Sequence, residues 1–321
     1  VGSEMCIRDR TKDEYEFGFD KLDRWIDMCR RCGIKYFEMS HLFTQWGAEH
    51  APKIVAEVDG EKKHIFGWET DADSEEYRDF LHRFAAALTA FIDRKGIRNF
   101  CRFHVSDEPS LEQYEVYKKR ADLIAEIFPG FKVIDALSDI EFFDKGAVKY
   151  PIPSEDHVED FVGKVDEFWT YYCCGQHNKN VPNRFFAMPS ARNRILGTLL
   201  YKYNATGFLQ WGYNYWYSQF SKHEIDPFTV TDAGKAFPSG DAFVVYPGED
   251  GQPINSLRFK VFYDGLQDLA AMRLLESLVG REKALEIAIQ DDELTFQKYP
   301  HGSSYLLALR ERVNKAIKEN I

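Results

Sequence analysis

The feature that most constrains the fold is a recurrence of strand-like runs separated by helical patterns. A strand with a following helix takes up roughly 30–40 residues, which is the length of a βαβ unit. The predicted strands lie near residues 35, 99, 131, 167, 207 and 241. In a chain of 321 residues this period predicts an α/β fold with a parallel sheet, either open or closed as a TIM-type (β/α)8 barrel. No Gly-rich phosphate-binding fingerprint follows any of these strands, so the nucleotide-binding version of the open sheet loses support.

Apolar spacing predicts several helices and one hairpin. The segment 13–32 carries apolar residues at helical spacing and stops at Gly33. A long helix is predicted from about 256 to 279, and two more close the chain. Between the first two strands, "KIVAEVDGEKKHIFGW" predicts a hairpin that turns at Asp59-Gly60. We expect this hairpin to be a loop excursion on the active face.

Charge and cysteine content exclude several classes of function. The net charge of −11 argues against nucleic-acid and anionic-membrane partners, which require basic patches. No apolar run approaches the length of a membrane span. Cys29 and Cys32 form a CxxC, but no second CxxC completes a zinc site. No paired His/carboxylate spacing appears either, so we predict no metal and no cofactor. Reduced cysteines would favour a cytoplasmic location.

The first ten residues, "VGSEMCIRDR", do not resemble the rest of the chain. They lack an initiating Met and show no periodicity, and they look like a translated cloning or sequencing adapter. We therefore expect a non-native leader at 1–10 and one barrel domain at 11–321.

The most informative motif is "FHVSDEPS", in which two adjacent carboxylates follow a strand. Strand alternation places Arg102, His104 and Ser106 on one face, toward the barrel interior. The same phase points Glu108 inward, whereas Asp107 is out of phase unless the chain kinks at the following proline. Inward residues at the carboxyl ends of barrel strands carry the chemistry in such enzymes. A helix N-cap explains Asp107 alone but not the inward residues beneath it.

Adjacent acids suit one particular kind of glycoside hydrolysis. Glycosidases with two carboxylates usually take the second one from across the site. Here only Asp135, Asp139, Glu249 and Asp250 are candidates, and none is obvious. A sugar with a 2-acetamido group supplies its own nucleophile, because its carbonyl oxygen attacks the anomeric carbon. One carboxylate then holds the acetamide nitrogen, while the other, with a raised pKa, protonates the leaving oxygen.

Several stretches together resemble the catalytic domain of glycoside hydrolase family 123. They are "LFTQWGAEHAP", "FHVSDEPS", "NRFFAMPSARNRILG", "GFLQWGYNYW", "GDAFVVYPGEDG" and "SLRFKVFYDGLQDL". The resemblance implies a (β/α)8 barrel and exo-acting β-N-acetylgalactosaminidase activity by the substrate-assisted, retaining route. It implies that Asp107 orients the acetamide and that Glu108 is the general acid/base. The expected partner is a carbohydrate with terminal β-linked N-acetylgalactosamine.

The resemblance also implies that the barrel is incomplete. If the acid pair ends the fourth strand, the strand at Tyr36 is the third, and the first two strands are missing. An N-terminally truncated barrel would leave open edges at Tyr36 and Phe243, so we expect a fragment that is poorly soluble and nearly inactive.

The other candidate site residues are predicted one by one from their positions near the ends of strands or in the loops that follow. The predicted substrate-binding residues are His41, Tyr172, Arg184, Trp211, Tyr213, Asn214 and Trp216. Beneath the site, the inward phase of Glu38 and Arg102 predicts a buried ion pair. Two other functions stay open: a glycosidase for sugars without an acetamide, which would use Asp135 or Asp139, and a non-catalytic carbohydrate-binding barrel.

Overall fold

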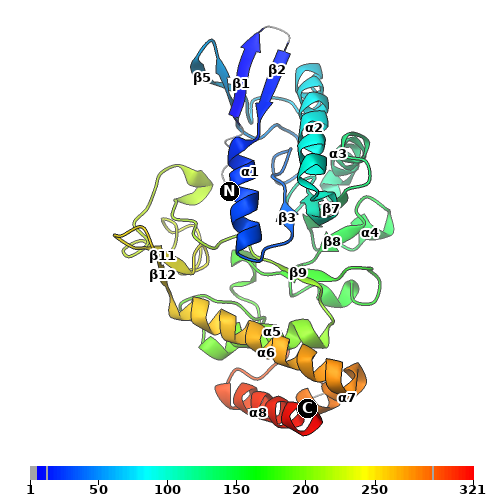
Figure 1. Ribbon diagram of the computed structural model, residues 1–321, viewed down its shortest axis with the longest axis vertical. Helices are drawn as coiled ribbons and strands as arrows, with labels where there is room; N and C mark the ends of the chain where they lie inside the picture. The colour runs from blue at the N-terminus through cyan, green and yellow to red at the C-terminus, as the bar shows by residue number, and fades with distance from the viewer. Residues whose placement is uncertain (1–5, 12–13, 291–292) are drawn as a thin grey trace. The chain divides into compact units, whose positions relative to one another are not determined.

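The computed structural model describes residues 6–11, 14–290 and 293–321. The chain divides into two compact units, residues 1–152 and 153–321, which we call the N-terminal and C-terminal units (Figure 1). Residues 1–5 of the predicted leader lie outside the described residues. Of the helices in the described part of the chain, none has both the length and the apolar character that a membrane span requires.

Four short parallel strands form the main sheet of the N-terminal unit. In order across the sheet they are β3 (Phe37–Glu38), β6 (Cys101–Phe103), β7 (Lys132–Ala136) and β8 (Tyr150–Ile152). The register places Glu38 beside Arg102 and Phe103 beside Val133. The predicted α/β class with a parallel sheet is confirmed. The sequence did not predict β8, because three residues with a central proline give no periodic signal.

A second sheet in the N-terminal unit has the order β2-β1-β4-β5. Its strands are β1 (Cys6–Thr11), β2 (Glu14–Gly18), β4 (Ile54–Val58) and β5 (Glu61–Phe66). The predicted hairpin is confirmed: β4 and β5 pair antiparallel, and Asp59 and Gly60 take φ values of 55° and 80°. Two consecutive residues with positive φ are what a tight hairpin turn requires.

The helix predicted over 13–32 is wrong at its start. It begins later, as α1 (Asp20–Arg31), because residues 14–18 belong to β2. Those residues alternate Glu with an aromatic residue, which is a strand period. Tyr15 and Phe17 pack against Phe80 with ring centroids 5.3 Å and 5.8 Å away.

Helices cover the main sheet of the N-terminal unit. They are α2 (Glu75–Lys95), α3 (Tyr114–Ile127) and α4 (Glu141–Asp144), with 3-10 turns η1 (Arg98–Phe100) and η2 (Leu111–Gln113). Figure 1 shows α2 and α3 close together, as their contacts require. The Ser74 side chain caps α2 by accepting from the Tyr77 backbone N–H, and Gly96 ends the helix with φ 65°. Phe103 of β6 stacks on Phe128, just after α3, at 4.1 Å.

The C-terminal unit holds two further pairs of strands. The strands β9 (Trp169–Tyr171) and β10 (Gly207–Leu209) are parallel, as predicted. The strand predicted near 241 is present as β11 (Val245–Pro247), but it pairs antiparallel with β12 (Pro253–Asn255) and not parallel. The turn between them contains Gly251, with φ 77°, and returns the chain beside itself within a few residues. The incomplete (β/α)8 barrel stays a prediction.

The helices of the C-terminal unit pack closely on one another. They are α5 (Ser190–Lys202), α6 (Leu257–Val279), α7 (Arg281–Ala288) and α8 (Ser303–Asn320), with 3-10 turns η3 (Val158–Asp160), η4 (Cys174–Gln176) and η5 (Gln219–Ser221). The backbones of α5 and α6 touch where two glycines meet. A Cβ on Gly197 would lie 1.8 Å from the Gly265 carbonyl oxygen, so this crossing requires glycine.

Candidate active site

The acid pair lies on the segment that follows β6, between two neighbouring chain segments. The Trp46 backbone N–H, in the loop after β3, donates to the Asp107 carbonyl at 3.0 Å. The Glu108 N–H donates to the carbonyl of Ala136, the last residue of β7, at 2.9 Å. Both sides of the pair are therefore held at the carboxyl ends of parallel strands, where α/β enzymes place their chemistry.

The predicted kink is present at Glu108. Its φ is 45°, in the left-handed region that costs a non-glycine residue roughly 1–2 kcal/mol. The kink ends the strand alternation directly after Asp107. Asp107 is half-buried, whereas the Glu108 side chain is exposed.

The environment of Asp107 disfavours its negative charge. Burial, the Glu108 carboxylate and the Asp135 carboxylate raise the pKa of Asp107 to about 7, and His104 opposes them. We expected a raised pKa at Glu108, the proposed acid. The carboxyl whose pKa is raised beside the kink is that of Asp107, the residue proposed to orient the acetamide.

A buried histidine lies beneath the acid pair, between two carboxylates. His104 is 5% exposed, and its Nδ1 lies 3.3 Å from Asp135 Oδ1. Its Nε2 lies 3.8 Å from Glu38 Oε2. Burial lowers the pKa of His104, but the two carboxylates outweigh this effect and raise it to about 10. His104 is therefore an imidazolium at neutral pH.

Asp135 fixes this arrangement from β7. Its carboxylate is fully buried and accepts from the Val105 N–H at 3.1 Å to each oxygen. The Tyr117 hydroxyl of α3 donates to Oδ2 at 2.5 Å. With His104 on its other side, this carboxylate has its acceptor positions occupied.

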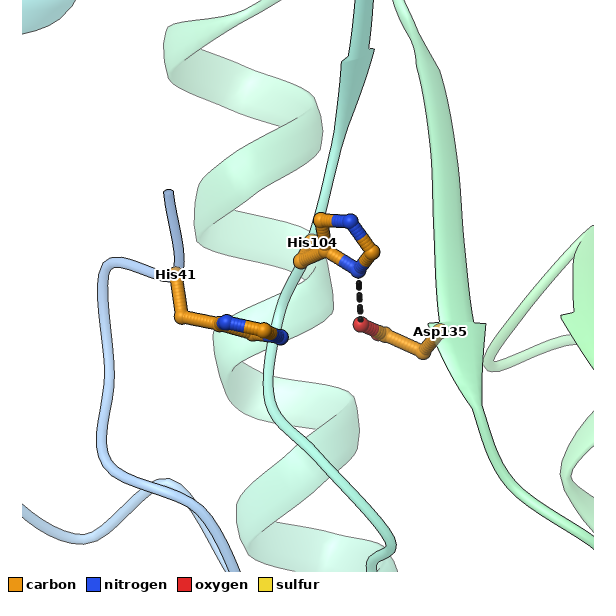
Figure 2. Close-up of side chains that lie close together, drawn as sticks. All are labelled: His41, His104 and Asp135. Carbon is orange, nitrogen blue, oxygen red and sulfur yellow. Dashed lines mark ion pairs between the residues drawn. The ribbon is translucent and has the colours of Figure 1, made fainter. Parts of the chain in front are cut away.

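His41 completes the cluster, as Figure 2 shows. Its ring centroid lies 4.6 Å from that of His104. His41 is exposed as a residue, yet desolvation by the surrounding protein, together with His104, lowers its pKa to about 4. His41, His104 and Asp135 each place one ligand atom within 4.8 Å of the others, a spacing that could hold a metal ion. Because both nitrogens of His104 face carboxylates, we assign the cluster as an ion-pair network.

The predicted ion pair between Glu38 and Arg102 is wrong. Glu38 pairs with His104, and the Arg102 guanidinium turns to backbone carbonyls, at 3.2 Å from Asn99 and 3.1 Å from Cys101. The guanidinium also lies over the Tyr36 ring, 5.2 Å from its centroid. The alternation along the strands correctly placed both side chains on one face, but it does not determine which neighbouring group each side chain contacts.

Two predicted binding residues are buried in the C-terminal unit. Tyr172, directly after β9, is fully buried, and its hydroxyl has no hydrogen-bond partner among the residues described. Arg184 is 3% exposed and donates to the backbone carbonyls of Gly212 and Asp241. Arg184 thus holds two loop segments of this unit together, and it lies near enough to Tyr172 to influence its charge.

The other predicted binding residues of this unit lie after β10, which ends at Leu209. Trp211, Tyr213 and Asn214 are exposed, and a sugar can reach them. The Trp211 ring packs on Phe237 at 5.2 Å, which leaves it 41% exposed. Trp216 is half-buried and donates from Nε1 to the Val245 carbonyl at 3.0 Å, so it fixes the loop.

Two buried carboxylates of the C-terminal unit were missed. Asp241 is fully buried; burial raises its pKa to about 6, with Arg184 and Trp211 opposing. Glu155 is also fully buried, and burial raises its pKa well above the usual range. The available signal for Asp241 was a lone acid at the start of the apolar run "DAFVV".

Parallel strands that carry an acid pair at their carboxyl ends define the class of α/β enzymes that includes glycoside hydrolases. The family model described as "Glycoside hydrolase 123, catalytic domain" matches residues 2–275. The chain belongs to glycoside hydrolase family 123, as the resemblance predicted.

A solved structure supports the fold. It is a family 123 glycoside hydrolase from Clostridium perfringens, described for glycolipid glycan hydrolysis. The superposition has a TM-score of 0.65 at 16% identity and covers 98% of this chain and 57% of that one. This chain therefore spans just over half the length of that structure. No curated protein matches the sequence.

Proposed function

We propose that the protein is an exo-acting, retaining glycosidase that removes terminal β-linked N-acetylgalactosamine by substrate-assisted catalysis. The observation that carries the proposal is the placement of Asp107 and Glu108 as adjacent carboxylates at the carboxyl end of β6, with the left-handed turn at Glu108. Family membership supports a carbohydrate substrate.

The two alternative nucleophiles are poorly placed for an attack on a sugar. Asp135 is fully buried, and its oxygens bind Val105, Tyr117 and His104. Asp139 accepts from the Glu141 N–H at 3.0 Å, at the start of α4. The arrangement therefore favours a nucleophile that the substrate supplies over a cross-site carboxylate.

In the proposed first step, the acetamide carbonyl oxygen attacks the anomeric carbon, and the bond from that carbon to the leaving oxygen breaks. Glu108 gives its proton to the leaving oxygen. Asp107, once ionised, accepts from the acetamide N–H and stabilises the positive charge of the cyclic oxazolinium intermediate. Water then opens this ring with Glu108 as the base, so the product keeps the β configuration. The scheme requires no cofactor.

The testing experiment is a screen of chromogenic β-glycosides with and without the 2-acetamido group, on the wild type, Asp107→Asn and Glu108→Gln. We expect cleavage of the β-N-acetylgalactosaminide, little cleavage of the β-galactoside, and large losses in both variants. Equal rates on the two sugars, or a covalent sugar trapped on any side chain, would contradict the proposal and favour a cross-site carboxylate.

A further inference from the structure

Negative charge is concentrated around the acid pair of the N-terminal unit. Glu108 and Asp135 both act to raise the pKa of Asp107, and His104 is the group that acts to lower it. Like charges this close disfavour joint ionisation. The proposed mechanism nevertheless requires an ionised Asp107, because only the ionised carboxylate is purely an acceptor for the acetamide N–H.

The contacts of His104 fix its charge state by geometry. Each of its ring nitrogens faces a carboxylate oxygen, Asp135 Oδ1 at 3.3 Å and Glu38 Oε2 at 3.8 Å. A neutral imidazole has one N–H, whereas the imidazolium has two. The two carboxylates therefore favour the imidazolium; the Asp135 pairing is shielded from solvent, since both side chains are buried, whereas the Glu38 side chain is 40% exposed.

The other basic groups near His104 do not supply this charge. The adjacent His41 is neutral in the working range, since its pKa is lowered to about 4 by desolvation and by His104. Arg102 is directed to the Asn99 and Cys101 carbonyls. From α3, Tyr117 contributes a hydroxyl donor to Asp135 and no positive charge.

We propose that His104 is a positioning residue of the active site: as an imidazolium held between Asp135 and Glu38, it favours the ionised form of Asp107, which can then orient the substrate acetamide. The catalytic part of this inference, that Asp107 orients the acetamide, rests on the proposed function. Its physical content, the coupling between His104 and Asp107, does not depend on activity.

The test uses carbon-13 NMR of aspartate-labelled protein, with the Asp107 signal assigned by Asp107→Asn. His104→Gln removes the charge, and His104→Lys restores a cation at the same position. We expect the Asp107 titration midpoint to rise by about one pH unit in His104→Gln, the low end of the effect of losing an opposite charge. It should return toward the wild-type value in His104→Lys. The acid limb of kcat/KM on the aryl β-N-acetylgalactosaminide should move in the same way.

The matched control is His82→Gln, which removes an exposed histidine 3.8 Å from the Glu126 carboxylate on the helical surface of the same unit. Its Asp107 midpoint should equal that of the wild type. An unchanged midpoint in His104→Gln, or equal shifts in His104→Gln and His104→Lys, would overturn the inference. If His104→Gln does not fold, imidazole NMR of the wild type decides, since a neutral His104 ring at pH 8 would also overturn it.

The two proposals fail in different ways. A protein that shows the shift of Asp107 but cleaves no acetamido sugar would refute the proposed function and leave the coupling intact. A protein that depends on Asp107 and Glu108 for cleavage, with an Asp107 midpoint insensitive to His104, would refute the positioning role alone.

Discussion

The replacement of His104 by glutamine should destabilise the protein at pH 6 far more than at pH 10. At pH 6 the wild-type imidazolium pairs with two carboxylates, and Asp135 among them is fully buried. Glutamine leaves both carboxylates without a cation at every pH. A buried ion pair that loses one partner is strongly destabilised, because the remaining charge is uncompensated.

The magnitude follows from the two pKa values of the histidine. The carboxylates raise the pKa of His104 from 6.5 to about 10 in the folded protein. A pKa raised by folding means that the folded state binds the proton more tightly. At about 1.36 kcal/mol for each pH unit, this contributes about 5 kcal/mol to the free energy of unfolding. The contribution is fully present below pH 6.5 and is lost as pH rises toward 10.

The assay is urea unfolding at pH 6, 8 and 10, followed by tryptophan fluorescence and near-UV circular dichroism. The chain has two compact units, which can give two transitions. Only the transition of the N-terminal unit should respond to the change at His104. The control is again His82→Gln, whose exposed histidine should change the unfolding free energy by less than about 1 kcal/mol at any pH.

One result would refute the reasoning directly. If His104→Gln lowers the unfolding free energy equally at pH 6 and pH 10, the histidine contributes packing and not charge. A wild-type stability that is flat from pH 6.5 to 10 would contradict the raised pKa itself.

Three further outcomes are expected. Glu108→Gln should lower kcat by several orders of magnitude for poor leaving groups and far less for activated aryl groups, measured over a leaving-group series; equal losses would remove the acid assignment. Because the pKa of Asp107 is raised to about 7, kcat/KM should fall about tenfold for each pH unit below that value, and an acid limb near pH 4 would contradict the required ionisation. Tyr117→Phe should cost about 1.5–3 kcal/mol of stability in thermal or urea unfolding, since the fully buried Asp135 loses its hydroxyl donor; no loss would show that this hydrogen bond is not formed.

The backbone conformation could be predicted from the sequence at positions where one residue type favours one conformation. The Asp59-Gly60 hairpin and the kink between Asp107 and the following proline were both predicted and are both present. Short elements could not be predicted from the sequence. The strand β8 has only three residues, one of them a proline, and β11 pairs with β12, which shows no strand pattern in the sequence. Three residues cannot display a period, so only the neighbouring strands define such an element.

The sequence also did not predict which groups the inward side chains pair with. Alternation along β3 and β6 placed Glu38 and Arg102 on one face, and the two residues lie side by side in the sheet. Glu38 nevertheless pairs with His104, which lies two residues after Arg102 in the sequence. Arg102 instead makes two carbonyl hydrogen bonds and lies over the Tyr36 ring. A choice among several donors within reach depends on atomic distances, which strand phase does not contain.

The central claim, that the substrate supplies the nucleophile beside Asp107 and Glu108, is tested most directly by fluorination of that nucleophile. The measurement is kcat/KM for aryl β-galactosaminides whose acetamide methyl carries zero, one, two or three fluorine atoms. Each fluorine withdraws electrons from the carbonyl oxygen, so the account predicts a steep, progressive fall in rate across the series. A flat series would contradict the account and assign the nucleophile to the protein.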